Sequence, residues 1–236
     1  MKRLAINLGI ARQPSSVRMA NKKAGRPTGS AVKEPPQDIK DKVLKRDRNT
    51  CRFCGFTSEK YQEILNLTHN YADTRTQNLA TACVFCAQCF YLEKVSVMRS
   101  GVLIWLPEIT QASLNHIARA IYVARISQGA VADTARTVLE QIMGRREEAK
   151  KRLDTDDPFI LSSVLRDYLT DEQYDLRKKR LAGVRLFPLD RRIIKEGDLE
   201  FNQFPQILAF WRSKNGPFAD NPPNKWIETY YDLIAA

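Results

Sequence analysis

The pattern of apolar and polar positions predicts a short helix and then a short strand in the first half of the chain. Pro36-Gln37-Asp38 is typical of a helix start, and apolar residues then recur at helical spacing at Ile39, Val43 and Leu44. The segment 61–69 is rich in strand-forming residues, so we expect a strand that turns Leu65 and Leu67 inward. A polar loop over 70–77 then leads to Asn78-Leu79, where a segment begins that is expected to enter a helix.

The second half of the chain is expected to contain one buried strand and several helices. The apolar run 101–106 is closed by Pro107, which is typical of a buried strand. Thr110 is a suitable cap for a helix whose apolar stripe contains Leu114, Ile117, Ala118 and Ile121, and His116 is off this stripe, so it is expected to face solvent. A second stripe follows Gly129, at Val131, Ala135, Val138, Leu139 and Ile142.

Shorter elements are expected beyond this helix pair. They cover residues 158–169 and 171–181. The last part of the chain is rich in aromatic residues, at Phe201, Phe204, Phe210, Trp211, Phe218, Trp226, Tyr230 and Tyr231.

Length and composition are those of a globular protein of one or two domains. The chain has 236 residues, and 43% of them are apolar, which is enough to bury a core. No apolar run approaches the roughly 20 residues that span a bilayer. We therefore expect a cytoplasmic protein that does not itself insert into a membrane.

Positive charge is concentrated at the start of the chain. The net charge is +11, and residues 1–33 contain no acid while carrying eight basic residues, namely Lys2, Arg3, Arg12, Arg18, Lys22, Lys23, Arg26 and Lys33. Glycine and proline are frequent over residues 20–36, which favours a flexible linker. Residues 1–36 are therefore interpreted as a basic, flexible arm, and nucleic acid is a candidate ligand.

Four of the five cysteines predict a zinc site. Cys51 and Cys54 form one C-x-x-C pair, and Cys83 and Cys86 form another after 28 intervening residues. Four thiolates match the tetrahedral preference of zinc, and Gly55 suits the turn past the second ligand. Such a set closes the coordination sphere and leaves no position for a reactive water, so one structural zinc ion is predicted.

The fifth cysteine leaves an alternative ligand open. Cys86 and Cys89 form a third C-x-x-C, so Cys89 is able in principle to replace Cys83. We favour Cys83, because Cys89 is expected one helical turn beyond Cys86, where a small buried thiol packs well.

The segments around the cysteines resemble the HNH endonuclease fold, a zinc-bearing treble clef. The matching segments are Arg46 to Cys51, Leu67-Thr68-His69 and Asn78 to Cys83. The resemblance places His69 at the general base and Asn78 at the asparagine of the motif. It also places Thr68 and Ala87 where that family holds its catalytic metal, and neither side chain is a useful ligand. The resemblance therefore implies a nuclease-like fold without catalysis.

A closer resemblance covers more of the chain. The segments RDRNTCRFCGF, NLATACVFCAQCF and LIWLPEITQASLN are similar to the signature segments of the IcmJ/DotN family of the Dot/Icm type IVB secretion system. This resemblance implies a cytoplasmic, zinc-bearing scaffold subunit of the coupling complex. Its implied partners are the C-terminal region of the coupling ATPase and other subunits of that complex, through which it is expected to reach the cytoplasmic face of the inner membrane.

These observations predict an α+β protein in three parts. The basic arm covers residues 1–36, an HNH-like treble-clef zinc domain covers 37–108, and a mainly helical region packed on the zinc core covers 109–236. A non-catalytic adaptor is the favoured function. The alternative is an HNH-type metal-dependent DNA endonuclease or a DNA-binding protein, which the basic arm favours and the missing ligands disfavour.

Overall fold

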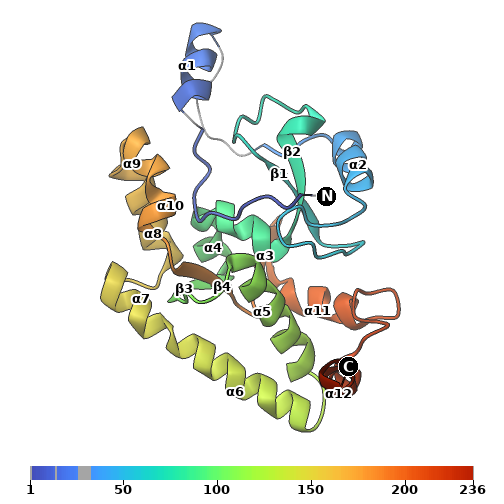
Figure 1. Cartoon of the computed structure of the whole chain (residues 1–236). Helices are drawn as coiled ribbons and strands as arrows, with labels where there is room; N and C mark the ends of the chain where they lie inside the picture. Colours follow the sequence, from blue (N-terminus) through green and yellow to red (C-terminus); the bar gives the residue numbers. More distant parts are fainter. Residues whose placement is uncertain (1, 14, 26–32, 236) are drawn as a thin grey trace.

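The computed structural model describes residues 2–13, 15–25 and 33–235 (Figure 1). Within these ranges the chain is an α+β structure, with helices around three separate two-stranded antiparallel sheets. The sheets pair β1 with β2, β3 with β4, and β5 with β6. None of the helices in the described ranges has the length and apolar character needed to cross a membrane.

The first sheet is a hairpin that α2 (Gln37–Arg46) covers. Strand β1 (Gln62–Asn66) pairs with β2 (Leu79–Cys83), and the short 3-10 helix η1 (Thr76–Asn78) precedes β2. Buried Asp47, at the end of α2, accepts a hydrogen bond of 3.0 Å from the backbone N–H of Thr81. The predicted strand is confirmed, and Leu65 is buried as expected, but Leu67 lies beyond β1 and is 39% exposed.

Strand β2 leads into short helices and then into the second sheet. These helices are α3 (Val84–Ala87), η2 (Gln88–Phe90) and α4 (Leu92–Met98). The predicted buried strand is β3 (Gly101–Trp105), and it pairs with β4 (Val184–Pro188). Leu103 and Leu186 face each other in this register, and both are fully buried.

The helices between β3 and β4 are α5 (Gln111–Arg125), α6 (Ala130–Gly144), α7 (Arg146–Leu153), α8 (Pro158–Asp167), α9 (Asp171–Asp175) and α10 (Arg177–Arg180). Of these helices, α5, α7 and α8 contact this sheet. The Thr110 side chain caps α5 by accepting a hydrogen bond of 3.1 Å from the backbone N–H of Ser113, as predicted. The α5 stripe buries Leu114, Ala118 and Ile121, whereas Ile117 stays 37% exposed.

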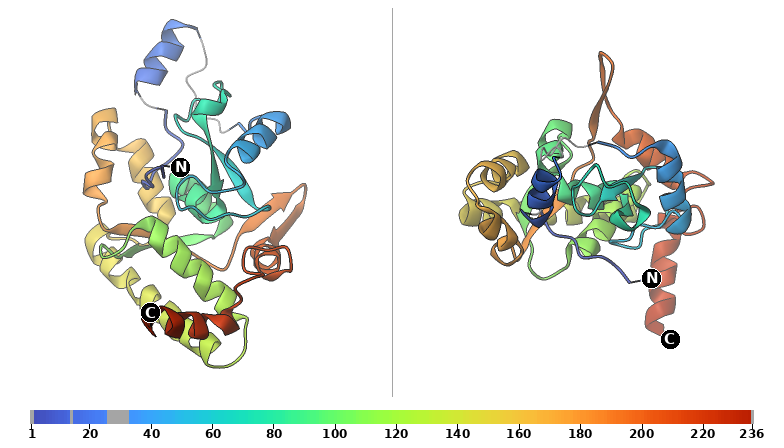
Figure 2. Two further views of the ribbon diagram at one scale, coloured as in Figure 1. Left: turned by 45° about the vertical axis from the view of Figure 1, so that its right-hand side comes forward. Right: turned by 90° about the horizontal axis from the view of Figure 1, so that it is seen from above.

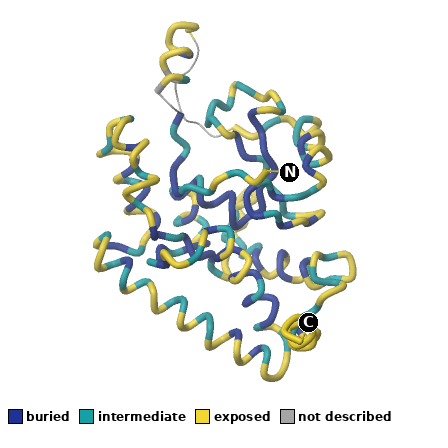
Figure 3. Tube along the Cα trace, in the orientation of Figure 1, coloured by how far each residue is buried: buried dark blue, intermediate teal, exposed yellow. Residues whose placement is uncertain are grey.

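The C-terminal part returns to the core and then leaves it. The hairpin of β5 (Ile193–Glu196) and β6 (Leu199–Asn202) extends from the body in the view from above (Figure 2). Helix α11 (Phe204–Arg212) buries Phe204, Ile207 and Trp211, whereas α12 (Trp226–Ala235), after η3 (Pro223–Lys225), has no buried residue (Figure 3). Strands β4–β6 lie in the region that was predicted to be mainly helical.

One hydrophobic core crosses the predicted boundary at residues 108 and 109. Its buried members include Phe56 and Phe85 from the first part and Trp211 from the second. The Trp211 ring meets the other two edge-on, with centroid distances of 5.6 Å to Phe56 and 5.5 Å to Phe85. Edge-to-face pairs of this kind stabilise a core beyond their buried area.

The N-terminal segment differs from the flexible arm that the sequence predicts. Leu8 and Ile10 are buried, the Gly9 N–H donates to the carbonyl of Cys89 at 2.9 Å, and the Leu92 N–H donates to the carbonyl of Gly9 at 3.0 Å. The prediction is therefore wrong for residues 4–13, because their apolar side chains fill a second hydrophobic cluster. Helix α1 (Ser15–Lys23) follows, and residues 26–32 of the predicted linker are outside the described residues.

We expect Tyr174→Phe to weaken the attachment of this segment. The Tyr174 hydroxyl accepts from the N–H of Ile10 at 3.1 Å and donates to the carbonyl of Ile10 at 3.2 Å. Its loss leaves both buried groups without a partner, which should lower the free energy of unfolding by about 1–3 kcal/mol. Guanidinium unfolding measures this loss. Tyr168→Phe is the control, since Tyr168 is 77% exposed, and an equal effect of both variants would contradict the prediction.

Candidate metal centre

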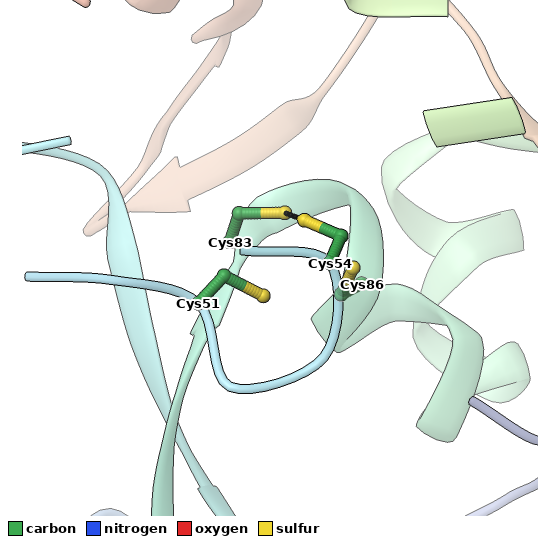
Figure 4. Close-up of side chains that lie close together, drawn as sticks. All are labelled: Cys51, Cys54, Cys83 and Cys86. Atoms are coloured by element: carbon green, nitrogen blue, oxygen red, sulfur yellow. Dashed lines mark hydrogen bonds between the residues drawn. The ribbon is translucent and has the colours of Figure 1, made fainter. Parts of the chain in front are cut away.

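The side chains of the four predicted metal ligands lie close together in the structure. Cys51 and Cys54 lie in a turn between α2 and β1, Cys83 ends β2, and Cys86 lies in α3. All four are buried, and their sulfur atoms are within 4.8 Å of one another (Figure 4). The Sγ atoms of Cys54 and Cys83 are 3.7 Å apart.

Backbone hydrogen bonds shape the first turn. The N–H of Gly55 donates to the carbonyl of Cys51 at 2.9 Å, and the N–H of Cys51 donates to the carbonyl of Phe56 at 2.8 Å. A bridge between Thr50 and Thr57 closes the loop. Gly55 has a φ of 84°, a conformation that is strained for other residues, which explains the glycine directly after the second cysteine.

The sulfur geometry fits a tetrahedral metal ion. Zn–S bonds of about 2.3 Å in a tetrahedron place the sulfur atoms about 3.8 Å apart. Burial raises the pKa of the Cys83 thiol well above its ordinary value, so four ionised thiols at these distances need a bound cation. The described residues can therefore hold a metal ion with Cys51, Cys54, Cys83 and Cys86 as its ligands.

A row of buried polar side chains on α5 contacts this site. The row consists of Gln111, Asn115 and Arg119, which are at most 7% exposed. Asn115 Nδ2 donates to Cys86 Sγ at 3.2 Å, and Arg119 Nη2 donates to Cys83 Sγ at 3.2 Å. Gln111 Nε2 donates both to Asn115 Oδ1, at 2.9 Å, and to the carbonyl of Leu186, at 2.8 Å. The row therefore connects the cysteines to β4.

Arg119 gives the site a buried positive charge. Its guanidinium lies over the ring of Phe56, 3.8 Å from the centroid, and only 1% of the residue is exposed. Within the described ranges no carboxylate forms an ion pair with it, so the cysteine sulfurs are its anionic neighbours. A buried cation of this kind is stable only beside compensating negative charge, which four thiolates on a bound metal ion would supply.

His116 is exposed, as expected, and its ring also contacts the site. Its Nε2 lies 2.9 Å from the carbonyl of Cys54, and its Nδ1 lies 3.2 Å from Arg119 Nη1. Arginine only donates, so Nδ1 accepts and Nε2–H donates to the carbonyl. Asn115, His116 and Arg119 were not predicted to contact the cysteines. The one pattern in the sequence that could have indicated them is that Gln111, Asn115 and Arg119 recur at helical spacing beside the apolar stripe of α5.

Cys89 lies outside the cluster of four. It is fully buried in η2, and its Sγ is 3.4 Å from the carbonyl of Phe85, to which the thiol donates. Burial raises the pKa of this thiol above its ordinary value, so Cys89 stays protonated. This placement agrees with the preference for Cys83 over Cys89 in the predicted set.

We expect Cys89→Ser to keep the bound metal and to lower stability by about 1–2 kcal/mol, because the serine hydroxyl also reaches the carbonyl but packs less volume. Cys83→Ser should lose the metal. Metal analysis of the purified variants and their thermal unfolding measure both effects. Loss of metal from Cys89→Ser together with retention in Cys83→Ser would contradict the ligand assignment.

The residues that the resemblance assigns to an HNH motif form hydrogen bonds within their own loop. Asn78 Nδ2 donates to Asn66 Oδ1 at 3.0 Å, and Thr68 Oγ1 is 3.4 Å from the same oxygen. His69 Nδ1 lies 3.1 Å from the hydroxyl of Tyr71. Burial, with Arg177 nearby, lowers the pKa of His69 to about 4, so the ring is neutral at pH 7. Ala87 is buried in α3.

Comparisons with known proteins show what this chain is similar to in sequence. No model of a known protein family matches the chain. The chain is 34% identical over 169 residues to the type 4 apparatus protein DotN of Legionella pneumophila subsp. pneumophila. The alignment covers 70% of this chain and 78% of DotN.

Proposed function

Because the chain belongs to the IcmJ/DotN family, we propose that it is a component of a type IV secretion apparatus of the Dot/Icm type. In that apparatus it acts as a zinc-stabilised scaffold. Its partner is the C-terminal region of the coupling ATPase, which joins it to the other subunits of the coupling complex. Through this partner it resides in the cytoplasm at the inner membrane. The relative's description as a type 4 apparatus protein supports the assignment.

The observation that carries the scaffold role is the closed cysteine site and its attachment to α5. Four thiolates fill the coordination sphere of zinc, so the ion has no position for substrate or reactive water. Asn115 and Arg119 bond two of the sulfurs from a helix of the other half of the chain. Zinc in this site therefore joins two parts of one core and offers a rigid surface to a partner.

We further propose that the zinc segment is an HNH-like treble clef without nuclease activity. The order of cysteine turn, β1–β2 hairpin and α3 supports this fold. Thr68 and Ala87 stand where that family holds its catalytic metal. The Thr68 hydroxyl is engaged with Asn66, and the Ala87 methyl offers no ligand atom. Phosphodiester cleavage without that metal loses several kcal/mol of transition-state stabilisation.

Plasmid nicking with added magnesium, manganese or nickel tests this part of the proposal. We expect cleavage at the level of buffer alone, and no difference between the wild-type protein and His69→Ala. Metal-dependent cleavage that His69→Ala abolishes would favour the alternative of a DNA endonuclease.

Calorimetric titration with a C-terminal fragment of the coupling ATPase tests the partner. We expect a Kd of about 10 µM or tighter. Raising salt from about 50 to 200 mM should weaken this binding by less than about threefold, whereas nucleic-acid binding with many phosphate contacts loses about 10³-fold or more. Absence of binding, or binding that is lost at the higher salt concentration, would contradict this partner and favour nucleic acid as the ligand.

A further inference from the structure

We infer that the N-terminal segment is a strap that limits the exchange of the metal ion at the cysteine site. The strap consists of residues 3–10, and it runs from the N label toward α10 in Figure 1. Its first residues contact the turn of Cys51 and Cys54, and its later residues contact the segment that follows Cys86. The inference rests on a zinc ion bound by the four cysteines, as proposed above, but not on the proposed partner.

The turn that carries the first cysteine pair is the part of the site nearest to solvent. Arg52 and Gly55, which neighbour the cysteines of this turn, are half-buried. The second pair lies in β2 and α3, where every residue is buried. Local opening of a protein begins where few buried contacts hold the backbone. Opening of this turn is therefore the expected route by which the site exchanges its metal ion.

Two residues of the strap hold this turn. The N–H of Leu4 donates to the carbonyl of Arg52 at 2.8 Å, and the N–H of Arg52 donates to the carbonyl of Thr81 on β2 at 2.8 Å. The guanidinium of Arg3 lies against Gly55, so closely that a Cβ atom on Gly55 would be 2.7 Å from Arg3 Nη2. The backbone of the turn is therefore bonded both to β2 and to the strap.

The other end of the strap is attached beyond the second cysteine pair. The N–H of Gly9 donates to the carbonyl of Cys89 at 2.9 Å, and the carbonyl of Gly9 accepts from the N–H of Leu92 at 3.0 Å. Gly9 also approaches Tyr174 closely, since a Cβ atom on Gly9 would be 2.9 Å from the Tyr174 hydroxyl. The residues on either side of Gly9 are buried. This fixed end keeps the first residues of the strap beside the turn, so the turn opens only when they detach.

The rate at which the folded protein gives up zinc to a chromophoric chelator tests the strap. Leu4→Pro lacks the N–H that bonds Arg52, whereas Leu4→Ala keeps this N–H and loses more of the apolar side chain. Leu4→Pro should release zinc about three- to tenfold faster than Leu4→Ala, as expected for the loss of one hydrogen bond. A contribution of side-chain packing alone would give the opposite order.

Two further pairs of variants test each end of the strap. Arg3→Ala and Lys2→Ala remove the same charge from exposed positions, but Arg3 covers Gly55, so Arg3→Ala should raise the release rate about threefold and Lys2→Ala should leave it unchanged. Arg3→Ala also serves if Leu4→Pro does not fold. Gly9→Ala displaces the distant end and should raise the rate as well, whereas a methyl group on Gly144 enters open space, so Gly144→Ala should not.

The rate of global unfolding distinguishes a strap from a contribution to overall stability. This rate is measured by tryptophan fluorescence in guanidinium and extrapolated to water, and zinc release from Leu4→Pro should be faster. Hydrogen exchange of the Cys51 and Gly55 amides should also be faster in Leu4→Pro than in Leu4→Ala, while the amides of β2 keep their protection.

Equal release rates within the Leu4 pair and within the pair of Arg3→Ala and Lys2→Ala would overturn the strap, as would release no faster than global unfolding. Either result would leave the proposed scaffold and its zinc ion in place. Purified wild-type protein without metal would remove the zinc ion and the strap together. Failure to bind the ATPase fragment would affect the proposed partner alone.

Discussion

Removal of the metal should unfold this protein. Structural zinc bound by four thiolates contributes about 10–16 kcal/mol, which exceeds the total stability of most domains of this size. The cysteines lie within the main core beside Phe56 and Phe85, so loss of the ion leaves buried thiols without a common partner. We expect one zinc per chain in purified protein. Treatment with a strong chelator should abolish the cooperative thermal unfolding transition, and adding zinc back should restore that transition.

Cys86→Ser should reproduce the effect of the chelator. The protein should be insoluble or sensitive to protease at room temperature, because a hydroxyl is a poor ligand for zinc. Cys89→Ser is the matched control, because it changes the same chemical group three residues further along the chain and outside the cluster. A folded, metal-free Cys86→Ser protein would mean that packing alone maintains this core.

Arg119→Met should lower zinc affinity by about 10–100-fold, the range seen when groups that support metal ligands are lost. The substitution removes the hydrogen bond to Cys83 and the positive charge that would oppose the two net negative charges of a zinc ion bound by four thiolates. Methionine keeps much of the volume between Phe56 and Trp211, so most of the loss is electrostatic. Competition with a chromophoric chelator measures the affinity.

The control for this variant is Arg125→Met on the same helix. Arg125 pairs with Asp190 at 3.1 Å near the surface, and exposed pairs contribute less than about 1 kcal/mol. Its zinc affinity should equal that of the wild type. Arg119→Lys should fall between the two, because lysine keeps the charge but loses the planar contact with the rings. Equal affinities for Arg119→Met and wild type would show that Arg119 serves packing alone.

The helices and strands with a strong local signal were predicted from the sequence. Helix α5 follows its Thr110 cap and its apolar stripe, and β3 follows an apolar run that ends at Pro107. The partner of β3 was not predicted. Strand β4 begins about 80 residues later, and nothing local to Val184–Pro188 encodes which strand it joins. That choice depends on the whole core, where Leu186 meets Leu103.

The N-terminal segment shows a different limit of sequence patterns. Its composition is basic and rich in glycine and proline, which predicts a flexible arm. Residues 4–13 nevertheless pack against the body of the protein, because Leu8 and Ile10 are buried in a cluster that includes residues of α8, β3 and β4. The amino-acid composition of a short segment does not indicate whether distant segments form a hydrophobic cluster against which it can pack.

The cysteine spacing by itself predicted a four-thiolate metal site and favoured Cys51, Cys54, Cys83 and Cys86, with Cys89 as the alternative to Cys83. Each C-x-x-C pair closes a local turn that places two thiolates on one metal ion, so this part of the site depends on local sequence. The tertiary structure alone decided what surrounds them. Arg119 is 36 residues from Cys83 in the chain, and only the packing of α5 against α3 brings its guanidinium within hydrogen-bond distance of the sulfur. Ligands are chosen by local chemistry, whereas the charge and hydrogen bonds around them depend on which helix packs there.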